Sequence, residues 1–80
     1  MKLTIALFGI TKEIIGGSSL AYELSEGNDV SSLLTSLYAH YPKLQHLKSL
    51  LVAVNSEYAE GEQILSENDE IALIPPVSGG

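Results

Sequence analysis

The fold is decided by the stretch DVSSLLTSLYAHYP, residues 29–42. Its apolar residues recur at positions i, i+3, i+4 and i+7, a spacing that places them on one face of a helix. They are Val30, Leu33, Leu34 and Leu37, followed by either Tyr38 or Tyr41. Asp29 can accept hydrogen bonds from the free amides of the first turn, whereas Pro42 cannot continue a helix. The stretch therefore predicts one amphipathic helix over residues 30–40, whose apolar face needs a surface to cover.

Short strands on both sides of this helix can provide that surface. Residues 3–8 and 20–24 alternate with period two, as expected for strands with one face in a core. Residues 52–54 predict a short strand that ends at Asn55. Residues 71–74 predict a short, almost wholly apolar strand, which is typical of a central position in a sheet. The Pro75-Pro76 pair ends the last strand because neither proline can donate a ladder hydrogen bond. This order of elements predicts an α+β domain, in which one main helix packs across one face of a mixed sheet.

The connections between these elements carry their own signals. Residues 11–15 predict a short helical turn closed by Gly16-Gly17, and residues 44–51 predict a second helical piece. Residues 66–70 form a polar turn, in which Asn68 best tolerates a left-handed backbone. Because both ends of the chain are strands, they can pair in parallel at the centre of the sheet. That arrangement is the β-grasp plan.

Length and composition limit what the chain can be. Its 80 residues allow one domain, residues 1–80, with residues 75–80 as a flexible functional tail. Apolar residues make up 45% and charged residues 18%, which is too hydrophobic for a disordered chain. The net charge is −6 and arginine is absent, so the chain lacks the bidentate reader of phosphate and guanine. We expect no nucleic-acid partner.

The absence of cysteine excludes several chemistries. Disulfides, thiolate metal sites and cysteine nucleophiles all need a thiol. No apolar run approaches the roughly 20 residues of a membrane span, and no small-residue cleavage site follows the short apolar start. We therefore expect a cytoplasmic protein without a membrane partner. Any sulfur chemistry of this chain must use an atom other than a cysteine sulfur.

Candidate catalytic side chains are scarce. His40 and His46 have a spacing that does not bring two imidazoles together on one helix face, so we expect no metal site. The carboxylates within residues 57–70 lack a basic or apolar setting and should form a solvated rim. The side chains alone do not indicate an enzyme.

The carboxyl terminus is the unusual part of the chain. Pro75-Pro76 fixes an extended exit from the last strand, Val77-Ser78 continues it, and Gly79-Gly80 ends it with a free carboxylate. A diglycine has no Cβ, so it can enter a channel too narrow for any other dipeptide and present its terminus to a distant active site. A frayed terminus would have the same sequence, so the tail alone leaves both interpretations open. In the functional interpretation the candidate reactive group is the Gly80 carboxylate, threaded into place by the residues before it. We expect this tail to be mobile before it binds a partner.

The C-terminal sequence resembles that of a known family. The run NDEIALIPPVSGG, residues 68–80, preceded by VAVN at residues 52–55, is similar to the small, sulfur-carrying subunit of molybdopterin synthase. This is the MoaD type of ubiquitin-like β-grasp protein. The resemblance extends from the first strand to the C-terminus and is most specific in the tail. Two departures are visible: Thr11-Lys12-Glu13 replaces the arginine-bearing segment often seen there, and Asn68 stands where glycine is usual.

This resemblance implies a mechanism for a chain without cysteine. An enzyme of the ubiquitin-activating type would adenylate the Gly80 carboxylate with ATP, and a sulfur donor protein would displace AMP to leave a thiocarboxylate. The tail would then enter the large, catalytic subunit of molybdopterin synthase and give its sulfur to cyclic pyranopterin monophosphate, forming the dithiolene of molybdopterin. The resemblance also implies a heterotetramer of two large and two small subunits, with no cofactor bound permanently to the small one.

Other functions share some of these features. A thiamine-pathway sulfur carrier has the same fold and Gly-Gly end, but such chains are usually shorter and lack the Pro-Pro-Val-Ser run. A ubiquitin-like modifier would use the same terminus for conjugation to lysines. A non-carrier interaction domain would leave the tail inert.

Strand alternation predicts a partner surface. If Leu3, Ile5 and Leu7 face the helix, Phe8 points to the other side of the sheet, and the same count places Ile74 there. Exposed apolar residues gathered beside the tail indicate a docking site. Tyr58, in a loop or hairpin predicted for residues 58–61, extends this surface. We expect the activating enzyme and the large subunit to bind it in turn.

Overall fold

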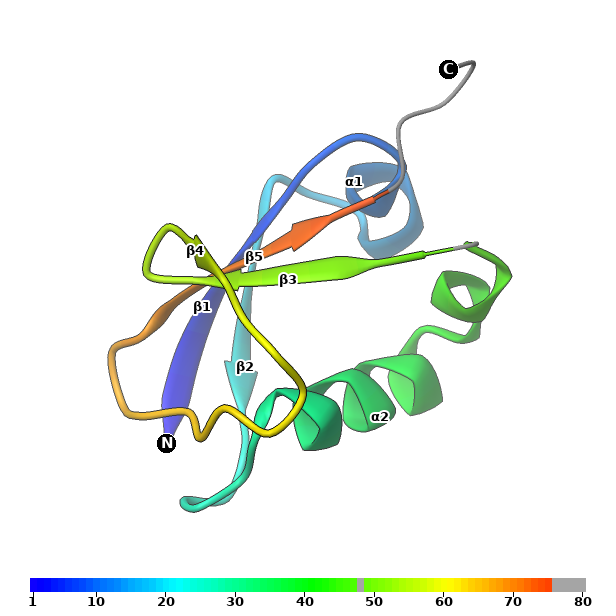
Figure 1. The fold of residues 1–80 in the computed structure, drawn as a ribbon. Helices are drawn as coiled ribbons and strands as arrows, with labels where there is room; N and C mark the ends of the chain where they lie inside the picture. The colour runs from blue at the N-terminus through cyan, green and yellow to red at the C-terminus, as the bar shows by residue number, and fades with distance from the viewer. Residues whose placement is uncertain (48, 76–80) are drawn as a thin grey trace.

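Five strands form a mixed sheet that is crossed by one main helix (Figure 1). The computed structural model describes residues 1–47 and 49–75. The elements in chain order are β1 (Lys2–Leu7), α1 (Ile10–Ile15), β2 (Ser19–Glu23), α2 (Val30–His40), the 3-10 helix η1 (Pro42–His46), β3 (Leu51–Val54), β4 (Glu57–Tyr58) and β5 (Glu70–Ile74). In the sheet the strands follow the order β2-β1-β5-β3-β4.

The first and last strands lie side by side at the centre of the sheet. β1 runs parallel to β5, with Ile5 opposite Ile71 and Leu7 opposite Leu73. β2 pairs antiparallel with β1 on one side, and β3 pairs antiparallel with β5 on the other. Parallel neighbours need a long crossover, and the chain between them, which contains α2, supplies it. The predicted β-grasp arrangement is confirmed.

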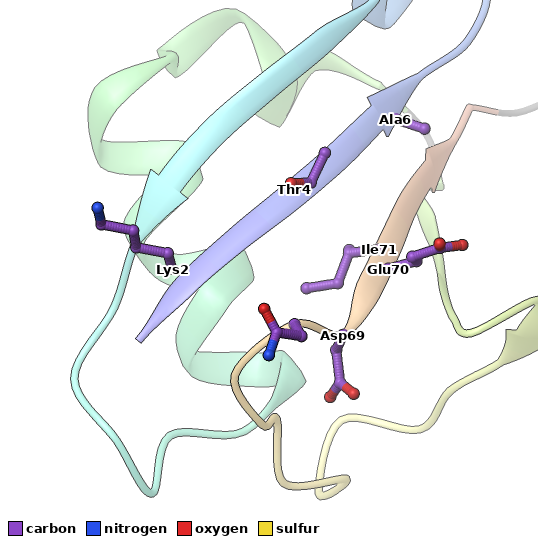
Figure 2. A pocket seen from close by; sticks show the side chains of 7 residues that line it. Lys2, Thr4, Ala6, Asp69, Glu70 and Ile71 are labelled. Carbon is purple, nitrogen blue, oxygen red and sulfur yellow. The ribbon is translucent and has the colours of Figure 1, made fainter.

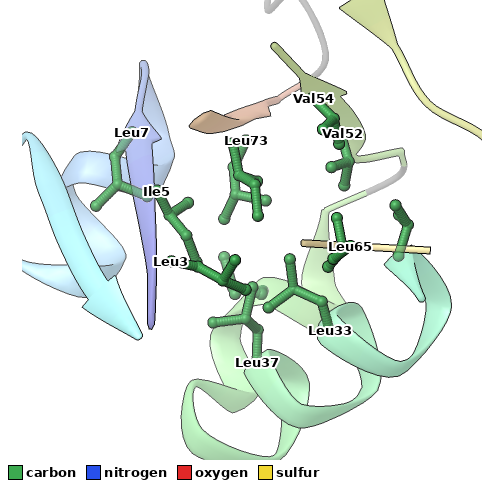
Figure 3. Close-up of a cluster of buried hydrophobic side chains, with 12 residues drawn as sticks. Leu3, Ile5, Leu7, Leu33, Leu37, Val52, Val54, Leu65 and Leu73 are labelled. Atoms are coloured by element: carbon green, nitrogen blue, oxygen red, sulfur yellow. The ribbon is translucent and has the colours of Figure 1, made fainter. Parts of the chain in front are cut away.

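The apolar face of α2 packs against one face of the sheet (Figure 3). Leu33 and Leu37 of the helix are fully buried, as are Ile5 and Leu73 of the two central strands. The other members of this core are Leu3, Leu7, Val30, Leu44, Val52, Val54, Leu65 and Ile71. Burial of one such side chain contributes roughly 1.5–3 kcal/mol relative to exposure. Packing on this scale determines which sheet face α2 covers and which face stays open.

The residues that bound α2 are those expected from the sequence. The Asp29 carboxylate caps the helix by accepting a hydrogen bond from the Ser32 backbone N–H at 2.9 Å. This bond, with a further one from the Ser32 side chain, lowers the pKa of Asp29 below its ordinary value of 3.8. At the other end the Tyr41 N–H donates to the Leu37 carbonyl, and Pro42 starts η1.

Residues in the left-handed conformation mark the turns. Gly16 ends α1 with φ 99°, and Asn68 has φ 72° in the turn before β5, as predicted. Asn55 and Ser56, with φ 52° and 72°, form the two-residue connection between β3 and β4. The Asn55 side-chain amide donates to the Asp69 carboxylate at 3.0 Å, which ties this hairpin to the turn that precedes β5.

Two predicted segments differ from the structure. The helical piece expected over residues 44–51 begins at Pro42 and ends at His46, because proline suits the first turn of a helix. Leu51 is not helical but begins β3, where it pairs with β5. The loop or hairpin expected at residues 58–61 is a hairpin, and its second strand already begins at Glu57.

Candidate functional site

The sheet face that α2 leaves uncovered, called the outer face below, forms the first part of the candidate site. Directly paired residues of neighbouring strands point to the same face of a sheet. One such row across the outer face consists of Ser19, Ala6, Ala72, Ala53 and Tyr58, from β2 to β4. Because the three central members are alanines, a partner can approach the central strands closely.

The end of the outer face nearest the tail is apolar. Phe8, which follows β1, is 48% exposed at this end. Tyr58 on β4 is 70% exposed and lies farther from the tail, in the row of Ala53. Ile74, the last residue of β5, is half-buried and pairs with Leu51 on β3. The predicted exposure of Phe8 and Tyr58 is confirmed, whereas Ile74 is more covered than expected. Large apolar side chains that gather on one open face indicate an interaction site.

Leu51 belongs to this apolar end, although it was not among the predicted site residues. Its side chain is 50% exposed. The signal was present, because Val52 and Val54 are buried and alternation then places Leu51 with Ala53 on the outer face. It was obscured because Leu44, Leu47, Leu50 and Leu51 also fit the spacing of a helix.

The opposite end of the outer face is polar (Figure 2). A groove of about 430 Å³ is lined there by Lys2, Thr4, Ala6, Asn68, Asp69, Glu70 and Ile71. The Asp69 carboxylate accepts from the Ser66 backbone N–H at 2.8 Å and from the Asn55 amide, and the Glu67 carboxylate accepts from the Lys2 backbone N–H. Asp69 and Glu67 therefore hold the turn before β5 in place. The outer face is thus graded from polar to apolar toward the tail.

The base of the tail packs against the loop that follows β1. β5 ends beside this loop in Figure 1, and Pro75 is half-buried there. A Cβ added at Gly9 would lie 3.1 Å from Cγ of Pro75, and Gly9 has φ +55°. Thr11 of the same loop is fully buried. Neither residue was a predicted site residue: Thr11 stood out only in the departure from the resembling family, and Gly9 belonged to no motif.

The remaining predicted site residues lie outside the described residues. They are Pro76, Val77, Ser78, Gly79 and Gly80. The expectation that the tail is mobile also falls on them, and it stays a prediction, as do their roles. The structure places the start of the tail, because Pro75 leaves the sheet directly after Ile74, at the apolar end of the outer face.

The histidines and acids take positions that fit structural or surface roles. His40 contacts the ring of Tyr22 edge-on, with 5.9 Å between ring centroids. His46 ends η1 and is exposed. Within residues 1–47 and 49–75, no three His, Asp or Glu side chains gather where they could hold a metal ion. In the same part of the chain, no helix has the length and apolar character needed to cross a membrane.

Comparison with known proteins relates this geometry to one family. Residues 5–80 match the model of the ThiS family. The molybdopterin synthase sulfur carrier subunit of Dictyostelium discoideum is 42% identical over 83 residues, which cover 99% of this chain and 96% of that protein.

Solved structures with the same fold agree over nearly the whole chain. Small archaeal modifier protein 1 from Methanosarcina acetivorans has a TM-score of 0.77 at 28% identity, over 99% of this chain and 96% of that one. A chain of the complex between subunits 1 and 2 of the molybdopterin-converting factor from Helicobacter pylori has a TM-score of 0.69 at 25% identity, over 100% of both chains. The family match extends to Gly80, the residue singled out as reactive.

Proposed function

Because the chain belongs to the ThiS family, we propose that it is the sulfur carrier subunit of a molybdopterin synthase. The observation that carries this proposal is the full-length match, through Gly79-Gly80, to relatives of that name. The apolar end of the outer face supports it, because a docking surface lies where the tail begins. In this function the chain donates sulfur, and the catalytic side chains belong to its partner.

The Gly80 carboxylate is the group that carries the sulfur. A free carboxylate is a poor electrophile, so it is first joined to AMP by attack on the α-phosphorus of ATP, with release of pyrophosphate. A donor of sulfur at the oxidation level of sulfide then attacks the acyl carbon. The C–S bond forms as the C–O bond to AMP breaks, so AMP leaves and a thiocarboxylate remains. The two C-terminal glycines suit this role because a segment without Cβ atoms can pass through a narrow channel to the acceptor. The acceptor is cyclic pyranopterin monophosphate, which becomes the dithiolene of molybdopterin.

Two partners use the same surface in this proposal. The large catalytic subunit binds the outer face through Phe8, Ile74 and Tyr58, joined by Leu51, and receives the tail. An adenylating enzyme of the ubiquitin-activating type, which supplies the ATP site, binds the same residues at an earlier step. Because one face cannot hold both proteins, their binding is mutually exclusive. The assembly with the large subunit is a heterotetramer, and we place it in the cytoplasm.

The test of this function is reconstituted sulfur transfer. The chain is incubated with ATP, an adenylating enzyme and a sulfur donor, then mixed with the large subunit and cyclic pyranopterin monophosphate. Dithiolene should form with the natural terminus and should not form when Gly80 is deleted or when one residue is added after it. Thermal unfolding of these variants should match the natural chain. Dithiolene formation by the Gly80 deletion would refute the proposal.

A second candidate function is attachment to lysines as a ubiquitin-like modifier. It is favoured by one observation, the likeness over nearly the whole chain to small archaeal modifier protein 1. Both functions begin with the same adenylate and differ in the group that attacks it. Mass spectrometry of tryptic peptides after expression in cells separates them. Trypsin last cuts this chain after Lys48, so conjugation leaves residues 49–80 as a remnant on lysines of other proteins. A carrier alone leaves none.

A further inference from the structure

Among the residues that the structure describes, Thr11 is the polar residue whose side chain is completely buried. A buried hydroxyl costs free energy unless it is hydrogen-bonded. The Thr11 hydroxyl both accepts a hydrogen bond from Phe8 and donates one to it. Oγ1 accepts from the Phe8 backbone N–H at 2.9 Å and donates to the Phe8 carbonyl at 2.5 Å. Thr11 therefore holds the backbone of Phe8 from both sides.

This clamp acts where β1 ends. Leu7 still has a backbone partner, since its N–H donates to the Ser18 carbonyl at 2.9 Å. Phe8 is the first residue after the strand, and the Thr11 hydroxyl supplies the partner for its N–H. Two backbone bonds close the same turn, from Thr11 N–H to the Phe8 carbonyl at 3.2 Å and from Lys12 N–H to the Gly9 carbonyl at 3.1 Å. The conformation of Gly9 inside this turn is fixed as a result.

Gly9 is the residue of this turn that contacts the tail. Its φ of +55° is one that side chains with a Cβ rarely adopt, and an added Cβ would lie 3.1 Å from Pro75 Cγ. Pro75 cannot easily yield, because it is half-buried and its ring fixes its own φ. β1 and β5 are parallel neighbours, so the turn after β1 and the first residue after β5 meet at the same edge of the sheet.

We propose that Thr11 is a positioning residue for sulfur transfer. It fixes the Gly9 backbone against which Pro75 packs, a contact surface called the seat below. This seat sets the direction in which the tail leaves the sheet. The proposal rests on the carrier function proposed above. A short tail reaches its acceptor more often when its first residue, Pro75, is held in one orientation than when that residue can change orientation. A displacement of about 1 Å far from the reacting atoms can cost up to about 100-fold in rate.

The first test needs no partner. In the isolated protein, NMR should show nuclear Overhauser contacts between the Gly9 Hα atoms and the Pro75 ring. Thr11→Val keeps the shape of the side chain but removes both hydrogen bonds, so these contacts should weaken while those between β1 and β5 persist. Thr11→Ser keeps the hydroxyl and should keep the contacts. Contacts unchanged in Thr11→Val would overturn the clamp.

The second test measures the transfer rate in a single turnover, with the large subunit saturating and the chain already thiocarboxylated. Thr11→Val and Gly9→Ala should slow transfer by about tenfold or more, and Thr11→Ser should restore the natural rate. Gly16→Ala is the matched control, because Gly16 also has positive φ but an added Cβ there meets nothing within 4 Å. It should lower stability without slowing transfer.

The outcomes separate the two proposals. If the natural chain itself delivers no sulfur, the carrier function fails, whereas the NMR contacts still decide whether the clamp exists. If the natural chain transfers sulfur and Thr11→Val does so at the same saturated rate, Thr11 has only a structural role and the positioning proposal is wrong. Equal slowing by Gly9→Ala and Gly16→Ala would also overturn it, because the effect would then come from backbone strain alone.

Discussion

Replacing Phe8 with alanine should weaken binding to the large subunit much more than it weakens the fold. A phenylalanine side chain can bury roughly 150–250 Å². Phe8 is 48% exposed, so about 100 Å² is left for a partner to cover. At about 25 cal/mol per Å², and with the alanine Cβ retained, the loss is about 2 kcal/mol. This corresponds to a dissociation constant about 30-fold higher.

Isothermal titration of the chain into the large subunit measures this effect, and a second titration into the adenylating enzyme tests whether both partners use Phe8. Thermal unfolding of the variant should stay close to that of the natural chain, because Phe8 is not a member of the buried core. Ile64→Ala is the matched control. Ile64 is 58% exposed but lies beside Asp29 at the start of α2. It should leave both dissociation constants unchanged.

Two results would show that Phe8 does not anchor a partner on the outer face. Unchanged affinity for both partners, together with a clear loss of thermal stability, would mean that Phe8 supports the fold instead of a partner. Equal loss of affinity in Phe8→Ala and Ile64→Ala would mean that exposed apolar area contributes in general and that the outer face has no special role.

Three further substitutions test the site and the fold. Leu51→Ala should raise the dissociation constant for the large subunit about tenfold and leave thermal unfolding nearly unchanged; the reverse pattern would place Leu51 in the core. Leu37→Ala, at a fully buried position, should lower the free energy of unfolding in urea by about 2–5 kcal/mol, and a loss below about 1 kcal/mol would contradict the packing of α2 on the sheet. Asp29→Asn keeps a capping oxygen but cannot titrate. Because the folded-state pKa of Asp29 is lowered, its ionised form adds stability that is present above the unfolded pKa and is lost as pH falls through the folded value. Urea unfolding below about pH 4 should therefore show a steeper loss in the natural chain than in Asp29→Asn, and equal slopes would rule out this role.

The main helix and the centre of the sheet could be predicted because their signals are local and agree with one another. Asp29 and Pro42 mark the two ends of α2, and the apolar spacing between them fits only one helix face. The last strand is almost wholly apolar from Ile71 to Ile74, which favours a central position, and it lies between β1 and β3.

The parts that could not be predicted depend on contacts between distant segments. Leu51 satisfied both a helical and a strand pattern, and only its pairing with Ile74 decides between them. In the sequence, Thr11 looks like an ordinary turn residue. Its role depends on β1 ending at Leu7, because the Thr11 hydroxyl then accepts from the Phe8 N–H in place of a neighbouring strand. The seat formed by Gly9 exists only because the parallel pairing of β1 and β5 brings it to Pro75.

The most direct measurement for the carrier function is intact-mass spectrometry of the chain after incubation with ATP, the adenylating enzyme and a sulfur donor. The chain contains no cysteine, so a sulfur retained under reducing conditions has no thiol to occupy. We expect the mass of the chain to rise by the difference between one sulfur and one oxygen atom, and fragmentation to locate the change at Gly80. An unchanged mass, or a sulfur located at any other residue, would mean that the Gly80 carboxylate does not carry the sulfur.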